Sequence, residues 1–126
     1  MNRESIDVKL IHMNITLICI LSDYLKIQNI VNALNKLDNN CYLTYMSTAC
    51  VFAGENEKYY TEDDVPAPKN YYSITKLCGE IVTRQYKNTC IIRPNFVPKK
   101  QWKYPKAFVD RFGTYLFTDQ VAHGIR

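Results

Sequence analysis

The chain has 126 residues, of which 47% are hydrophobic and 22% are charged, which is enough for one domain with a modest core and too little for two. Its formal charge of +4 comes from 16 Lys and Arg against 12 Asp and Glu, and the basic residues are scattered along the sequence. This scattering argues against a dedicated nucleic-acid binder. The longest apolar stretch, residues 15–21, is too short to span a bilayer, so no membrane partner is expected.

The numbers and positions of the cysteines and glycines exclude several kinds of site. The five cysteines are an odd number, form no CxxC pair and have no histidine at metal-ligand spacing, which argues against a disulfide framework and against a metal site. We therefore expect a reducing, cytoplasmic compartment. The four glycines, at positions 54, 79, 113 and 124, cannot form a GxGxxG turn or a P-loop. A nucleotide site in these residues thus lacks the usual phosphate-binding loop.

In chain order, the first predicted elements are a strand, a helix and a second strand. Residues 8–12 are a short β-prone run, and residues 24–37 carry apolar side chains at helical spacing. Residues 41–47 are rich in aromatic and β-branched side chains and predict a buried strand, which continues toward a turn at Gly54.

In the second half of the chain, predicted helices and strands continue to alternate. The clearest amphipathic helix is predicted over residues 71–86, where apolar residues recur at i, i+3, i+4, i+7 and i+8, with Asn70 as its N-cap. A third strand at 90–93 is halted by the proline that follows it. A brief helix is expected over 106–112, and Thr118 is the predicted N-cap of a last helix. This order predicts the α/β class, with a partial, doubly wound parallel sheet and helices on both faces.

The helix predicted over residues 71–86 contains a pair of side chains suited to acid–base catalysis. Tyr72 and Lys76 are four residues apart and therefore lie on one face, one turn from each other. Together with Gly79 and Thr83 they fall within a narrow arc opposite an apolar stripe centred on Ile81, which predicts a polar face free to line a cleft. An ammonium one turn from a phenol stabilises the phenolate and brings its pKa from about 10 nearer the working range.

A third group lies at the end of the preceding strand. Ser47-Thr48 could place a hydroxyl next to the phenol and hold a substrate carbonyl between the two. The alternative interpretation is a solvated tyrosine and lysine on an exposed helix face, because Y-x-x-x-K alone is a weak signal.

The order of these parts resembles the second half of the nucleotide-binding domain of the extended short-chain dehydrogenases/reductases. A narrower resemblance is carried by the segments 47–54 (STACVFAG), 60–64 (YTEDD), Pro66, Pro68, 72–76 (YSITK) and Gly79-Glu80. On these residues the chain is similar to the dTDP-4-dehydrorhamnose reductases and to related nucleotide-sugar epimerase/reductases. The likeness is good over residues 40–98 and loose over 5–40 and 99–126.

The resemblance implies a fold and a reaction. The fold is a single partial Rossmann-like NAD(P)-binding domain over residues 1–126, with the start of a substrate-binding region at 99–126. The reaction is NAD(P)-dependent reduction, or epimerisation and reduction, of a nucleotide-linked 4-keto-6-deoxyhexose. Both NADH and NADPH remain open, because the residue that reads the ribose 2′ position would lie outside the similar region.

The resemblance also implies roles for individual residues. Thr48 would polarise the C4 carbonyl of the sugar, Tyr72 would be the general acid, and Lys76 would bind the nicotinamide ribose while lowering the tyrosine pKa. The residues that match the segment flanking the nicotinamide are Pro94, Asn95 and Val97.

Two departures from the family pattern leave a second interpretation open. The family commonly has Asp-Tyr after its catalytic threonine, where this chain has Ala49-Cys50. The chain is also expected to start at the family's fourth strand, without the preceding half and its glycine-rich turn. The alternative is therefore a catalytically inactive, truncated relative that serves as a partner subunit or has no function. In either case the expected protein partner is a second copy or a complementing chain.

Overall fold

The computed structural model describes residues 23–37, 41–55, 59–97, 99 and 113–125. Residues 23–36 are helical. The elements that follow are β1 (Leu43–Met46), the 3-10 helix η1 (Ala49–Val51), α2 (Tyr71–Thr83), β2 (Thr89–Ile92), β3 (Phe96–Val97), β4 (Leu116–Phe117) and α3 (Thr118–Gly124).

The described strands form two small parallel sheets. β1 pairs with β2, with Leu43 opposite Thr89 and Met46 opposite Ile92, and α2 makes the connection between them. β3 pairs with β4 in the same parallel sense. The predicted fold class is confirmed, because the described residues form three α-helices and short parallel strands, compatible with part of a Rossmann-like sheet.

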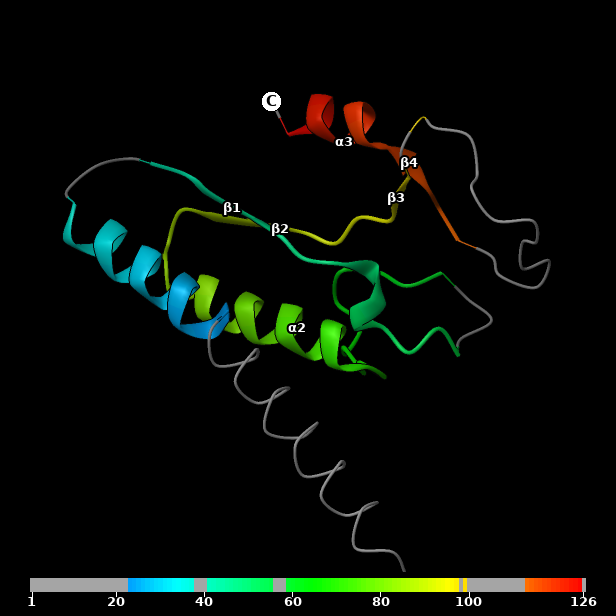
Figure 1. The fold of residues 1–126 in the computed structure, drawn as a ribbon, viewed down its shortest axis with the longest axis horizontal. Coiled ribbons are helices and arrows are strands. Elements are labelled where there is room, and N and C mark those ends of the chain that lie inside the picture. The colour runs from blue at the N-terminus through cyan, green and yellow to red at the C-terminus, as the bar shows by residue number, and fades with distance from the viewer. Residues whose placement is uncertain (1–22, 38–40, 56–58, 98, 100–112, 126) are drawn as a thin grey trace, which may run out of the picture.

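The core lies between the β1–β2 pair, α2 and the helix of residues 23–36. Figure 1 shows both helices on the same side of the two strands. Val31 and Val82 are fully buried, and each such side chain contributes about 1.5–3 kcal/mol relative to an exposed one. The Tyr86 hydroxyl donates to the Cys41 carbonyl at 2.8 Å and so ties the chain after α2 to the start of β1. The side chains that pack against this cluster are Ile27, Leu34 and Leu43.

Local sequence signals placed most of these elements correctly. The helix predicted over 24–37 and the strands predicted over 41–47 and 90–93 are confirmed as residues 23–36, β1 and β2. After β1 the chain enters η1, and a turn at Gly54 has a φ of 75°, in the left-handed region that favours glycine. The strand expected over 8–12 and the helix expected over 106–112 lie outside the described residues.

The helix caps agree with the prediction at one site and differ at the other. Asn70 is the N-cap of α2, since its Oδ1 accepts from the Ser73 amide at 2.9 Å while the Ser73 hydroxyl accepts from the Asn70 amide at 3.3 Å. Thr118 is the first residue of α3 and not its cap. The cap is Phe117, whose amide donates to the Gln120 side chain at 2.8 Å.

The face of α2 that packs on the sheet differs from the predicted one. Gly79 and Thr83 are buried, whereas Ile81 is 59% exposed. The prediction of an exposed polar arc is therefore wrong for the second half of the helix. The physical reason is that Gly79 has no Cβ, which lets the Tyr45 ring lie against the helix, and that the Thr83 hydroxyl is satisfied by donating to the Gly79 carbonyl at 2.7 Å.

Replacing Gly79 by Ala is expected to destabilise the protein by about 1–3 kcal/mol, although alanine is the better helix former. The new Cβ would lie 2.5 Å from Cζ of Tyr45, so the ring or the helix must move. Gly124→Ala is the matched control, because a Cβ there meets nothing within 4 Å. Urea unfolding measures both. A Gly79→Ala protein as stable as the wild type would contradict the close packing of Tyr45 on α2.

Candidate functional site

The three candidate catalytic residues come from neighbouring elements. The Lys76 ammonium, on α2, donates to the Met46 carbonyl at 3.0 Å, at the end of β1. Thr48 follows two residues later and is the N-cap of η1, which packs against α2. The structure thus joins Lys76 directly to the end of the strand that leads to Thr48, which spacing alone did not show.

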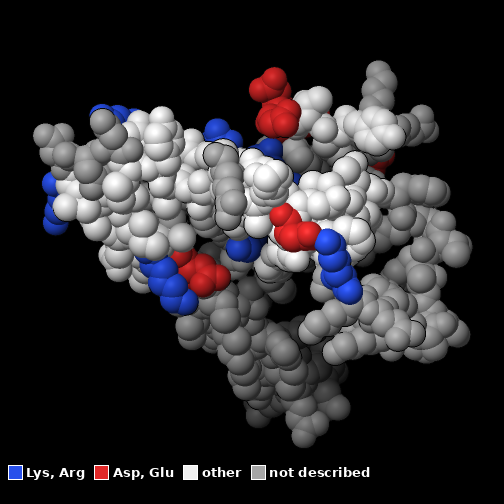
Figure 2. Space-filling model, turned by 90° about the horizontal axis from the view of Figure 1, so that it is seen from above, with Lys and Arg blue, Asp and Glu red and all other residues white. Residues whose placement is uncertain are grey.

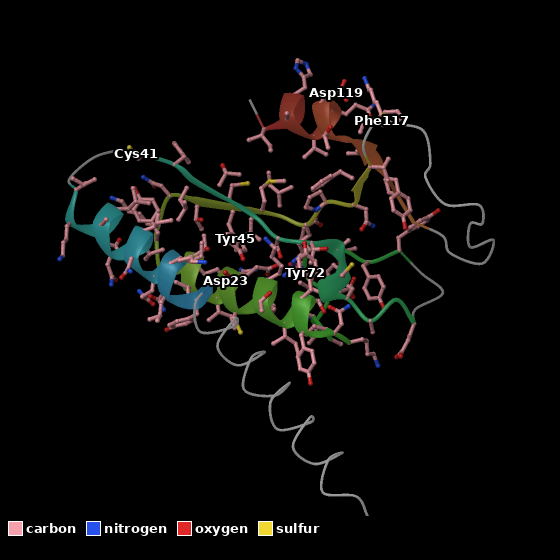
Figure 3. All side chains as sticks on the ribbon, in the orientation of Figure 1. Asp23, Cys41, Tyr45, Tyr72, Phe117 and Asp119 are labelled. Atoms are coloured by element: carbon pink, nitrogen blue, oxygen red, sulfur yellow. The ribbon has the colours of Figure 1, made fainter. Side chains whose placement is uncertain are left out.

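The Lys76 ammonium also lies near two tyrosine rings. Its Nζ is 5.9 Å from the ring centroid of Tyr72 and 5.5 Å from that of Tyr45, both within the range of cation–π attraction. Tyr72 is 56% exposed, so its phenol is open to a ligand. Figure 3 shows Tyr45 on β1 and Tyr72 on α2.

Sequence reasoning missed Tyr45. Burial raises the pKa of its phenol to about 12, and the negative charges of Asp23 and Glu80 act in the same direction. This phenol is therefore protonated at any physiological pH. Its place under Lys76 makes it part of the surroundings of the candidate pair and not a second acid of tuned pKa.

The two hydroxyls at the end of β1 have different partners. The Ser47 hydroxyl donates to Oε1 of Glu80 at 2.5 Å, whereas Oγ1 of Thr48 accepts from the Cys50 amide at 3.2 Å. A hydroxyl that accepts one hydrogen bond keeps its own proton to donate. Of the pair, Thr48, which is 6% exposed, is thus the residue that keeps a hydroxyl proton to donate to a carbonyl.

A buried ion pair adjoins these residues and was not predicted. Glu80 is 1% exposed and accepts from Nε of Arg93 at 2.9 Å and from Nη2 at 2.7 Å. Burial alone would raise the pKa of this carboxyl, but the hydrogen bonds from Arg93 and Ser47 and the charges of Arg93 and Arg84 together lower it below its usual range. Glu80 is therefore a buried carboxylate.

The residues expected beside the nicotinamide follow β2. The Pro94 carbonyl accepts from the Ala49 amide at 3.4 Å, which places this proline against η1. The Asn95 carbonyl accepts from the amide of Leu116 at 3.0 Å, and Val97 pairs with Phe117. All three are half-buried, with Pro94 beside the candidate threonine and the other two beside β4.

An open pocket lies against another face of α2. Its volume is about 420 Å³, and its walls include residues 62–66 together with Leu77, Ile81 and Arg84. Neither Thr48 nor the tyrosine and lysine of the candidate pair contributes to it. The predicted cleft along the tyrosine and lysine face is therefore not this pocket.

Other features of the described residues complete the site's surroundings. Within them, no group of three or more His, Cys, Asp or Glu is placed to hold a metal ion. The thiols of Cys50, Cys78 and Cys90 are free. Figure 2 shows charged side chains in small groups on the face that it presents. No helix in the described segments has both the length and the hydropathy needed to cross a membrane.

The described residues form part of a parallel α/β domain, and the polar groups around Lys76 lie at the ends of its strands. A family model described as the RmlD substrate binding domain matches residues 26–121, more than half of the chain. The chain belongs to this family of sugar-nucleotide reductases, which confirms the dTDP-4-dehydrorhamnose reductase-like resemblance at the family level. No curated protein and no solved structure matches the chain significantly.

Proposed function

We propose that this chain carries the catalytic segment of an NAD(P)-dependent reductase of the extended short-chain dehydrogenase/reductase type. The substrate would be a nucleotide-linked 4-keto-6-deoxyhexose, which is reduced, or epimerised and reduced. The observation that supports this most is the position of Lys76, within 5.9 Å of the Tyr72 ring centroid and hydrogen-bonded to the strand that leads to Thr48. Membership of a sugar-nucleotide reductase family supports the substrate class.

In this proposal each polar group has a defined role. The exposed phenol of Tyr72 is the general acid that gives its proton to the carbonyl oxygen as this oxygen becomes a hydroxyl. The Thr48 hydroxyl donates to the same oxygen and polarises the carbonyl before reduction. Lys76 donates to the ribose of the nicotinamide and stabilises the phenolate left on the tyrosine. NAD(P)H, when bound, would supply the hydride for the carbonyl carbon.

The residues present fit one end of the cofactor. Pro94, half-buried against η1, with Asn95 and Val97 after it, offers a surface for a nicotinamide ring next to the candidate threonine. These 126 residues contain no glycine-rich turn to hold a pyrophosphate. We therefore propose a single partial domain in the cytoplasm, whose residues 99–126 begin a substrate-binding region and whose protein partner is a second copy or a complementing chain. Of these two partners, only a complementing chain would add a pyrophosphate-binding turn.

The chain alone is expected to show no saturable NADH or NADPH binding below millimolar concentration, because the pyrophosphate and adenosine contacts are not provided. Titration followed by nicotinamide fluorescence measures this. Reduced nicotinamide mononucleotide is the matched control ligand, and it is expected to bind as weakly as NADH. A micromolar dissociation constant for NADH that the mononucleotide does not share would show that the chain does hold the adenosine end.

The proposed function is tested by restoring the other half of the domain. Residues 40–98 are grafted into a complete member of the family, or the first half of such a protein is added in trans. The restored protein is expected to oxidise NADH or NADPH when given a nucleotide-linked 4-keto-6-deoxyhexose. A folded graft that binds the dinucleotide but turns over no such sugar would support the alternative, an inactive relative that serves as a partner subunit or has no function.

A further inference from the structure

We propose that Glu80 is a positioning residue, whose buried carboxylate fixes residues 47–48 and 93–94 against the helix that carries the candidate acid. This inference rests on the proposed function for its catalytic meaning. Its structural part, that one carboxylate aligns the segments after both strands, stands on contacts alone.

The register of the β1–β2 pair explains why one carboxylate reaches both segments. Parallel strands end at the same edge of a sheet, and here Met46 pairs with Ile92 at that edge. Ser47 and Arg93 are the next residues of each strand, and the Ser47 amide still donates to the Ile92 carbonyl at 2.8 Å. Both side chains therefore start at the same level, and both donate to Glu80 from it.

The position of Thr48 depends on the Glu80 carboxylate through the residues on both of its sides. It directly follows Ser47, whose hydroxyl donates to the carboxylate at 2.5 Å. On the other side, the Ala49 amide donates to the carbonyl of Pro94, which directly follows Arg93. Loss of the carboxylate releases both neighbours, so the threonine hydroxyl loses its fixed direction relative to α2.

A second set of contacts connects the ion pair of Glu80 and Arg93 to the loop after η1. The Arg93 guanidinium lies 5.0 Å from the ring centroid of Phe52, which stacks on Tyr60 with centroids 4.6 Å apart. The Tyr60 hydroxyl accepts from the amides of Gly54 and Glu55 at 3.1 and 3.2 Å. The ion pair thus orders the chain on both sides of the candidate threonine.

The energetics also favour a positioning role. A buried ion pair adds little net stability over apolar residues of the same size, because desolvation offsets the attraction. Three hydrogen bonds on one carboxylate, however, fix directions that apolar packing does not. The Ser47 hydroxyl is the part of the network that can be removed while the ion pair stays, which separates alignment from stability.

The first test uses the 126-residue chain itself and needs no catalysis. In Ser47→Ala and Glu80→Gln, we expect the amide signals of Ala49 and Cys50 to shift and their hydrogen exchange to quicken by about tenfold or more. In Ser47→Ala, which keeps the ion pair, the Leu43 amide is expected to keep its protection. Glu55→Gln, which removes a carboxylate from an exposed ion pair with Lys69, is the matched control and is expected to leave all three unchanged.

The outcome is decided by Ser47→Ala if Glu80→Gln fails to fold. Unchanged shifts and exchange of the Ala49 and Cys50 amides in a folded Ser47→Ala protein would overturn the inference. In Ser47→Ala, changes spread equally to Leu43 would also overturn it, because they would indicate general loosening of the sheet and not local alignment.

The second test uses the restored enzyme. Ser47→Ala is expected to lower kcat about tenfold with an unchanged KM for the nicotinamide cofactor, and Ser47→Thr, which keeps the hydroxyl, is expected to restore it. Equal loss in both variants would contradict positioning through the hydroxyl. If the unaltered restored enzyme has no activity, the proposed function fails, and the amide measurements still decide whether Glu80 aligns these segments.

Discussion

Tyr72→Phe is expected to lower the turnover of the restored reductase by about 10² to 10⁴, the usual effect of losing a positioned acid. The substitution removes only the hydroxyl and keeps the ring that lies 5.9 Å from the Lys76 ammonium, so the helix and its packing should be unchanged. The measurement is the rate of nicotinamide oxidation with a nucleotide-linked 4-keto-6-deoxyhexose, at saturating cofactor.

The neighbouring tyrosine provides the matched control. Tyr71 is 61% exposed and Tyr72 is 56% exposed, and both lie in the first turn of α2. Tyr71→Phe therefore removes the phenol of a similarly exposed tyrosine without touching the candidate acid, and full turnover is expected. Unchanged turnover of Tyr72→Phe in an active graft would mean that Tyr72 is a solvated side chain on the helix surface and not the acid.

The other two candidate residues should affect the kinetics differently. Lys76→Ala is expected to lower both turnover and cofactor affinity, because the ammonium is assigned to the phenolate and to the ribose. Thr48→Val is expected to lower turnover with less effect on cofactor binding, because its hydroxyl addresses only the substrate carbonyl. Identical losses from the two variants would contradict this division of roles.

Elements with a strong local signal could be predicted from the sequence. The apolar spacing over residues 24–37 and the N-cap at Asn70 both depend on a few adjacent side chains, and both are confirmed. β3 and β4 have two residues each, too few to show any periodicity. Their pairing depends on residues twenty positions apart, so no local pattern could have revealed it.

The orientation of α2 shows where periodicity stops being informative. Helical spacing correctly groups Gly79 and Thr83 on one face, but it does not say which face meets the sheet. That choice depends on Tyr45, which fills the space that the missing Cβ of Gly79 leaves. The small Gly79 lets the Tyr45 ring approach the helix closely, and the Thr83 hydroxyl beside it is already hydrogen-bonded. This face therefore packs on the sheet more closely than the face with the bulky apolar side chains would.

The candidate site, too, was predictable only where it depends on residues close together in the sequence. The four-residue spacing of Tyr72 and Lys76 is local and holds, whereas the choice between the two hydroxyls after β1 is made by Glu80, far along the chain. One signal was available. Glu80 lies four residues after Lys76 and three before Thr83, so it shares their helix face, and a carboxylate on a face that packs against a sheet requires a charged partner.

Glu80→Gln is expected to lower the free energy of unfolding by about 3–5 kcal/mol, because it leaves the guanidinium of Arg93 in a site where its side chain is only 14% exposed. Urea unfolding at neutral pH measures the loss. Glu55→Gln, from a pair whose side chains are 60% and 69% exposed, is the control and should leave stability unchanged.

The same variant gives a pH dependence with a defined sign. The pKa of Glu80 is lowered in the folded protein, so its contribution is complete above the pKa of an unfolded glutamate and is lost as the pH falls through the lower folded value. The difference in stability between the wild type and Glu80→Gln should therefore be constant near neutrality and shrink in acid. A difference that grew in acid would mean that burial, which raises this pKa, outweighs the hydrogen bonds that lower it.

Replacing both partners separates the charge from the space that it fills. In Glu80→Leu combined with Arg93→Met, no buried charge is left alone, and apolar side chains fill the same volume, so most of the lost stability should return. The Ser47 hydroxyl then has no carboxylate, and the exchange of the Ala49 and Cys50 amides should stay fast. Recovered stability with unrecovered alignment is the result expected of a group whose role is to position residues 47–48. A double variant that restored both would reduce Glu80 to a packing role.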